Sequence, residues 1–159
     1  MLTPLLALWA VASAQTPDTA VGARRTAALH ALRDSVAAVQ AAALAFRIDL
    51  GTASSDLVLA RARRVHQRCA GARRTARSLA VLLAGTPQRA SEQRARRDLG
   101  ELERVLQQCD RDYDPAAPGA NPDTLKAWGP FRLSQLELEL RRYTQGVQAL
   151  QGRETPGLR

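Results

Sequence analysis

Aromatic residues are scarce in this chain: Phe, Trp and Tyr make up 4% of its 159 residues. A folded core must therefore consist mainly of Ala, Leu and Val. The hydrophobic fraction of 45% and the modest Gly and Pro content argue against wholesale disorder. The length suggests one domain, which is large enough to bury a core.

Histidine and methionine are too few for the common cofactors of helical proteins. Met1 is the only Met, and the chain has two His. Non-covalent haem in a helical bundle uses axial His and Met, and covalent haem needs a Cys-x-x-Cys-His motif, which is missing. His30 is expected to face outward and His66 to flank a core seam, so they do not converge. Di-iron sites need Glu-x-x-His, which is also missing, and a zinc site needs more ligands. We expect no cofactor and no metal.

Catalytic arrangements are missing as well. Ser and Thr are scattered, without a His and a carboxylate that their spacing would align. There is no Cys-x-x-Cys motif for disulfide exchange. His66 lies one helical turn from Cys69, and we interpret it as a partly exposed polar residue beside a core cysteine. We expect a protein that is not an enzyme.

Acidic residues are absent from one basic segment. The chain has a net charge of +8, and the stretches 15–56 and 92–159 are each neutral. Residues 57–91 hold eight arginines and no acid: Arg61, Arg63, Arg64, Arg68, Arg73, Arg74, Arg77 and Arg89. Any electrostatic attraction for a partner therefore belongs to this segment.

The first fourteen residues resemble a signal peptide. An apolar run ends in Ala12-Ser13-Ala14, the small-x-small pattern of a cleavage site. We expect cleavage after Ala14 and export to the periplasm or the outside. An N-terminal helical turn that stays attached is the alternative. No later run reaches the roughly 18 apolar residues of a membrane span.

Four segments show helical spacing. Their apolar seams alternate steps of three and four residues: Leu29, Leu32, Val36, Val39, Ala43, Phe46, Leu50; Val58, Ala62, Val65, Cys69, Ala72, Ala76, Leu79, Leu83; Ala95, Leu99, Leu102, Leu106, Cys109, Tyr113; and Leu133, Leu136, Leu140, Tyr143, Val147, Leu150. This repeat predicts an all-α fold, an antiparallel up-down-up-down four-helix bundle over residues 15–152, followed by a flexible tail, 153–159. A long coiled-coil oligomer is the alternative.

Local signals mark the helix ends. Ser54, Ser55 or Asp56 is expected to cap the second helix, and Gly85 to follow its end. Thr86 or Ser91 is expected to cap the third helix. In the fourth, Asp123 is expected to cap a short first turn, and Pro130 to begin or kink the main helix.

The two cysteines test this fold. In an oxidising compartment Cys69 and Cys109 are expected to form one disulfide between the second and third helices, and two buried free thiols are the alternative. Paired residues of an antiparallel hairpin lie at equal distances from the turn, and the midpoint of 69 and 109 is 89. The disulfide therefore requires that the third helix does not already begin at Pro87.

The heptad positions divide the arginines of the second helix. Arg61, Arg68 and Arg73 flank the seam and are expected to pair with acids of the third helix. Those acids are Asp98, Glu103, Asp110 and Asp112. Arg63, Arg64, Arg74 and Arg77 face outward without a ready partner, which makes them candidates for binding an anion. The alternative is a solvated face that maintains solubility.

Apolar residues outside the seam mark a second surface. Trp128, Phe131 and Leu138 are candidate partner contacts, and Ile48 is a possible addition. Packing beneath the loop 114–122 is the alternative.

Together these patterns predict an exported, non-enzymatic bundle that acts through a surface, by binding, scaffolding or sequestration. The expected partner is a protein or an anionic envelope component. No aromatics lie between the arginines, so sequence-specific nucleic-acid binding is not expected. A small-molecule or cofactor carrier that uses space in the core is the alternative, and the oligomeric state stays open.

Overall fold

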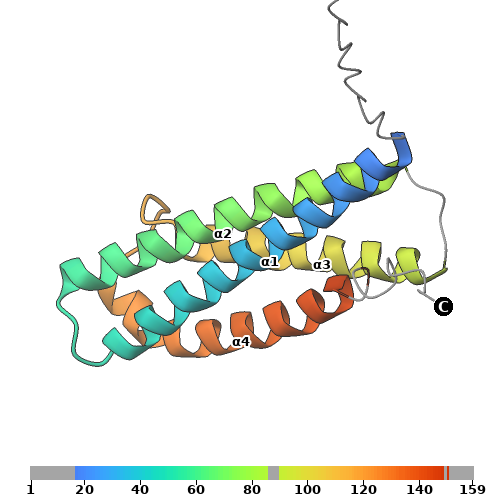
Figure 1. The fold of residues 1–159 in the computed structure, drawn as a ribbon. Helices are drawn as coiled ribbons and strands as arrows, with labels where there is room; N and C mark the ends of the chain where they lie inside the picture. The colour runs from blue at the N-terminus through green and yellow to red at the C-terminus, as the bar shows by residue number, and fades with distance from the viewer. Residues whose placement is uncertain (1–16, 86–89, 149, 151–159) are drawn as a thin grey trace, which may run out of the picture.

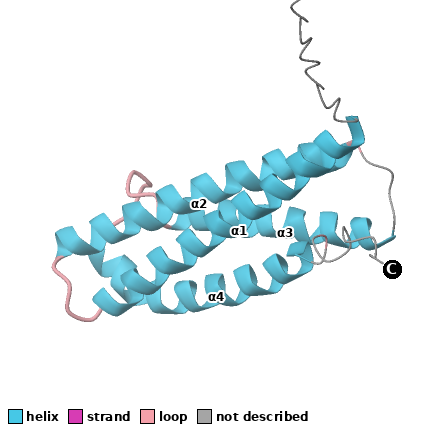
Figure 2. Cartoon of the chain, viewed as in Figure 1, coloured by secondary structure: helices cyan, strands magenta, loops and turns pink. Residues whose placement is uncertain are grey.

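The fold is an antiparallel bundle of four helices. A computed structural model describes residues 17–85, 90–148 and 150. The helices are α1 (Pro17–Asp49), α2 (Ser55–Ala84), α3 (Ala90–Asp112) and α4 (Pro122–Gln148), and they run alternately up and down (Figure 1). Helices and connecting loops account for all of the chain that is described, without a strand (Figure 2). The predicted fold class is confirmed.

The core is formed by the predicted seams. On α2, every seam residue from Val58 to Leu83 is buried. The seam residues of α1 and α3 are buried too, and on α4 only Tyr143 is partly exposed. Because the seam repeats every 3.5 residues, each helix keeps one face toward its neighbours along its whole length.

Small side chains line the central part of α2. Ala62, Ala72 and Ala76 are at most 1% exposed. The helix packs against α1 and α3 and also reaches α4 across the bundle. Alanine at these positions allows backbones to approach closely, although each such layer buries less apolar surface than a leucine layer.

The ends of α2 follow the sequence signals, whereas the start of α4 does not. The Ser54 side chain accepts a hydrogen bond from the Leu57 amide and caps α2. At α4 the cap is Asn121, whose side-chain oxygen accepts from the Thr124 amide at 2.7 Å. Asp123 was expected there. Pro122 takes the first helical position, where its fixed φ suits the helix and its missing N–H has no intrahelical role, so the cap is the residue before the proline, Asn121.

Pro130 lies inside α4 and does not begin it. One helix continues from Pro122 to Gln148 through the proline. Proline removes a single i→i−4 hydrogen bond, to Lys126 here. The flanking buried residues, Leu125 and Leu133, are both held in the core, which keeps the two parts in one helix.

A disulfide joins α2 to α3. Cys69 and Cys109 are bonded, with their Cα atoms 6.0 Å apart. Helix α3 is described from Ala90, and Pro87 lies outside the described residues. Closing this interval of 40 residues stabilises the fold by about 4 kcal/mol on the chain-entropy model.

Several sequence predictions fall on other parts of the chain. The expected signal peptide, the tail 153–159, Arg89 and a cap at Thr86 lie outside the described residues, as does the side chain of Ser91. Among the helices that are described, none has the length and apolarity to cross a membrane.

Candidate anion-binding face of α2

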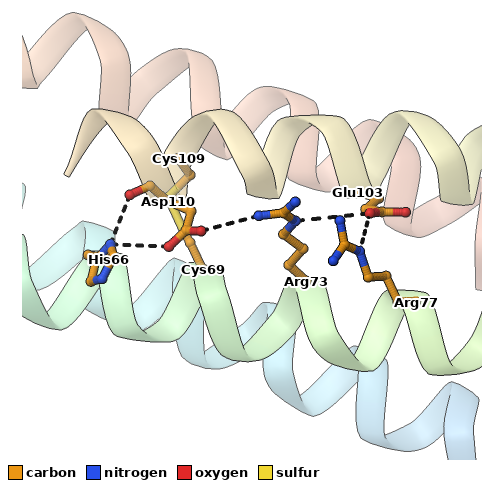
Figure 3. A network of polar contacts seen from close by, with 7 residues as sticks. All are labelled: His66, Cys69, Arg73, Arg77, Glu103, Cys109 and Asp110. Carbon is orange, nitrogen blue, oxygen red and sulfur yellow. Dashed lines mark hydrogen bonds and ion pairs between the residues drawn. A yellow bond between two sulfur atoms is a disulfide. The ribbon is translucent and has the colours of Figure 1, made fainter. Parts of the chain in front are cut away.

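A polar network lies over the disulfide, between α2 and α3 (Figure 3). The His66 Nδ1 is 2.8 Å from the backbone oxygen of Asp110 and 3.1 Å from its Oδ1. A carbonyl oxygen only accepts, so this contact places a proton on the His66 Nδ1. His66 is thus bonded to the residue after Cys109, in agreement with a structural role beside the cysteine.

Arg73 and Arg77 extend this network along α2. Arg73 lies 3.4 Å from Asp110 and 4.0 Å from Glu103, and Arg77 donates from its Nε to Glu103 at 2.5 Å (Figure 3). The expected pairing with acids of α3 is confirmed for Arg73. Arg77 was expected to have no ready partner, and that expectation is wrong. It follows Arg73 by one turn on the same side of the helix, so its long side chain reaches Glu103.

Arg61 pairs with a different helix from the one expected. Its Nε donates to Asp49, the last residue of α1, at 2.6 Å. Arg61 lies on the side of α2 that faces α1, so the acids of α3 are not its neighbours. Heptad position distinguishes a flanking residue from an outward one, but it does not say which neighbouring helix that residue meets.

Arg68 has no acid opposite it. Two contacts set the register of α2 against α1: Arg61 with Asp49, and Thr75 with Ser35. Arg68 is midway between the two α2 residues, and Ala42 is midway between the two α1 residues. The alanine side chain has no hydrogen-bond acceptor or negative charge for a guanidinium. Arg68 is exposed and, within the described part of the chain, makes no ion pair.

The result is a group of arginines on α2 without acidic partners, which we call the arginine face. Its members are Arg63, Arg64, Arg68 and Arg74. All are exposed, and none forms an ion pair or hydrogen bond with the residues described. Three of the four sequence candidates are therefore retained, and Arg68 takes the place of Arg77.

The arginine face is densest near the start of α2. Arg63 and Arg68 are about 7.5 Å apart along the helix axis, and Arg74 lies about 9 Å beyond Arg68. An open hollow of about 290 Å³ adjoins Arg63 and Arg64, and its other lining residues are Leu57, Ala60, Arg61 and Gln67. Each guanidinium offers five N–H donors in a planar fork that suits carboxylate, sulfate and phosphate oxygens.

The three candidate partner contacts on α4 do not share one environment. Phe131 is 65% exposed and Leu138 is 69% exposed, as is Ile48 on α1. Trp128 is half-buried, and its ring centroid lies 5.5 Å from that of Tyr113. Packing toward the loop thus accounts for Trp128, while Phe131 and Leu138 remain on the surface.

No metal cluster of three or more His, Cys, Asp or Glu residues is found in the described ranges. Comparison with known proteins finds no matching family model, no similar curated protein and no similar solved structure.

Proposed function

We propose that this is an exported binding protein whose arginine face holds an anionic polymer of the cell envelope. One observation carries the proposal. Of the seven arginines on α2, Arg61, Arg73 and Arg77 are neutralised by acids of α1 and α3. The four members of the arginine face are exposed and have no partner in the described structure. The positive charge that remains is therefore concentrated on one helix surface.

The chemistry of this face suits a repeated oxyanion. Guanidinium groups bind carboxylate, sulfate or phosphate bidentately and keep their charge at any physiological pH. Because the arginines are exposed, binding costs little desolvation, and the attraction weakens with salt. Helix α2 has no aromatic residue, so the face recognises charge and spacing and not bases. The proposal concerns binding alone and includes no reaction.

Retention on a heparin column tests the proposal with the full chain. The variant Arg63→Gln/Arg64→Gln/Arg68→Gln removes three charges from the arginine face. The matched control Arg94→Gln/Arg97→Gln/Arg104→Gln removes three exposed charges from α3. We expect the α2 variant to elute at much lower salt than the control. The slope of log affinity against log salt should fall by roughly one unit per lost contact.

Two results would contradict the proposal. Equal losses in the two variants would mean that net charge, and not this face, retains the protein. Unchanged retention together with lower solubility of the α2 variant would mean that the arginines form a solvated, solubilising surface.

A further inference from the structure

Half of the few aromatic residues converge at one end of the bundle. The chain has six, two each of Phe, Trp and Tyr. The rings of Phe46 and Tyr113 meet edge-on with centroids 5.8 Å apart, and Trp128 lies against Tyr113 at 5.5 Å. Phe46 and Tyr113 are at most 2% exposed. Trp128 is therefore held by a fixed aromatic support and keeps part of its indole outside the core.

The loop between α3 and α4, residues 113–121, is held by hydrogen bonds within the loop itself (Figure 1). Asp114 accepts a side-chain hydrogen bond from the Ala116 amide at 2.9 Å, and its backbone oxygen accepts from the Ala117 amide at 3.2 Å. Gly119 has a φ of 86°, a conformation that other residues rarely adopt. Pro115 and Pro118 further restrict the backbone. The loop backbone is thus preorganised before any ligand binds.

A pocket of about 470 Å³ lies between this loop and the helices. The apolar part of its lining comes from Trp128, Leu125 and loop alanines and proline, and its charged part from Arg111, Arg132, Asp112 and Asp114. Small-molecule sites typically measure about 300–1,000 Å³ and combine apolar walls with a few polar groups. The volume lies within that range, and the pocket is more open to solvent and more polar than a typical site of this kind.

Of the charged side chains that line the pocket, the two carboxylates accept hydrogen bonds, whereas the two guanidiniums have no such partner among the described residues. Asp112 accepts a hydrogen bond from Gln108 at 2.6 Å, and Asp114 accepts the bond from the Ala116 amide. The side chains of Arg111 and Arg132 form neither an ion pair nor a hydrogen bond with the part of the chain that is described. The two guanidiniums beside the indole are thus free to pair with an anion, in a pocket whose lining also holds two carboxylates that accept hydrogen bonds from neutral donors.

We propose that this pocket binds a small molecule with a flat apolar body and one oxyanion group, either carboxylate or phosphate. The flat body lies against the indole of Trp128 and the side chain of Leu125. The oxyanion pairs with Arg132 and Arg111, with the bidentate geometry that guanidinium favours. The site is at the end of the bundle where α3 joins α4 (Figure 1). Its lining includes no residue of the arginine face.

Titration by NMR tests this proposal, with the indole N–H signal of Trp128 as the reporter, assigned with Trp128→Phe. The probes are benzoate, phenyl phosphate, benzyl alcohol and inorganic phosphate. We expect saturable shifts with benzoate or phenyl phosphate, and the tighter of the two identifies the oxyanion. Benzyl alcohol lacks the charge and inorganic phosphate lacks the ring, so each should bind at least tenfold more weakly. Equal shifts with benzoate and benzyl alcohol, or no shift with any probe, would overturn the proposal.

Arginine variants test which positive charge binds the oxyanion. Arg132→Gln should weaken the binding of the better probe at least tenfold. The control Arg141→Gln removes an exposed arginine of α4 that pairs with Glu137, and it should leave binding unchanged. Equal affinities in the two variants would remove Arg132 from the site and defeat the proposal. The α2 triple variant should bind the probe as the natural protein does, so loss of heparin binding and loss of probe binding are separate results.

Discussion

Gly146 of α4 lies directly against the side chain of Asp98 on α3. A Cβ placed at residue 146 would stand 2.6 Å from the Asp98 Cγ and 3.0 Å from its Cβ. Both distances are shorter than van der Waals contact allows. The aspartate side chain is short, so it has little freedom to withdraw. The close approach of these two helices therefore depends on the missing side chain at residue 146.

Gly146→Ala should destabilise the protein although alanine favours helices. Overpacking typically costs about 1–3 kcal/mol, which exceeds the roughly 1 kcal/mol gained in helix propensity. Gly100→Ala is the control, because a Cβ at Gly100 meets nothing within 4 Å, and it should stabilise α3. Urea unfolding measures both. Equal stabilisation by the two substitutions would show that Asp98 and Gly146 are not in contact.

Reducing the disulfide should lower the free energy of unfolding by about 4 kcal/mol. The loss comes from the larger conformational freedom of the unfolded chain. Thermal or urea unfolding with and without reductant measures the effect, and Cys69→Ala/Cys109→Ala should reproduce it while becoming insensitive to reductant. A reductant effect that persists in the double variant would contradict this account.

Tyr113 should limit stability at alkaline pH. Burial raises the pKa of its hydroxyl above the usual range, and that hydroxyl has no hydrogen-bond partner in the described structure. The unfolded chain loses this proton near pH 10, before the folded chain does. The contribution of Tyr113 is therefore fully present below about pH 10 and declines as the pH rises above it.

The variant Tyr113→Phe should unfold less readily above pH 10 than the natural protein. It also removes an unpaired buried hydroxyl, so at neutral pH we expect little change or a gain of about 1 kcal/mol. Tyr143→Phe is the control, since Tyr143 is only partly buried and should leave the alkaline transition in place. Identical alkaline curves for the two variants would show that Tyr113 is not the group responsible.

Glu103→Gln should strengthen heparin binding. The substitution leaves Arg77 without its acid, beside Arg74 of the arginine face, while Arg73 keeps Asp110. Elution should shift to higher salt. Glu101→Gln makes the same change in net charge on α3, where Glu101 pairs with Arg104, and should have a smaller effect. A larger shift with Glu101→Gln would place the binding surface on α3.

The sequence was sufficient for the architecture because the signals are local and periodic. The 3.5-residue seams identified nearly every core residue. The disulfide followed from two cysteines on facing seams at similar distances from a turn. Ser54 could be identified as a candidate cap because capping depends on neighbouring residues.

The arginines mark the limit of such reasoning. Heptad position assigned Arg68 to a pair and left Arg77 free, and the structure reverses both. An ion pair depends on which helix lies opposite and on which residue of that helix lies at the same height along the bundle axis. Glu103 lies within reach of Arg77, whereas Arg68 forms no ion pair with the residues that are described. Such a pairing depends on the positions of two helices relative to each other, so the sequence of one helix cannot predict it.

The same distinction holds for the pocket beneath the loop. The sequence identified Trp128 as exposed apolar surface and residues 114–122 as a loop. Only the tertiary structure places Trp128 on Tyr113 and brings Arg111 and Arg132 to one pocket, where their side chains have no partner among the described residues. The sequence by itself determined how many helices form, which faces they bury and that a disulfide joins two of them, because backbone and side-chain periodicity act over a few residues. Which charges stay unmatched was decided by tertiary structure, because pairing depends on register between helices distant in the chain.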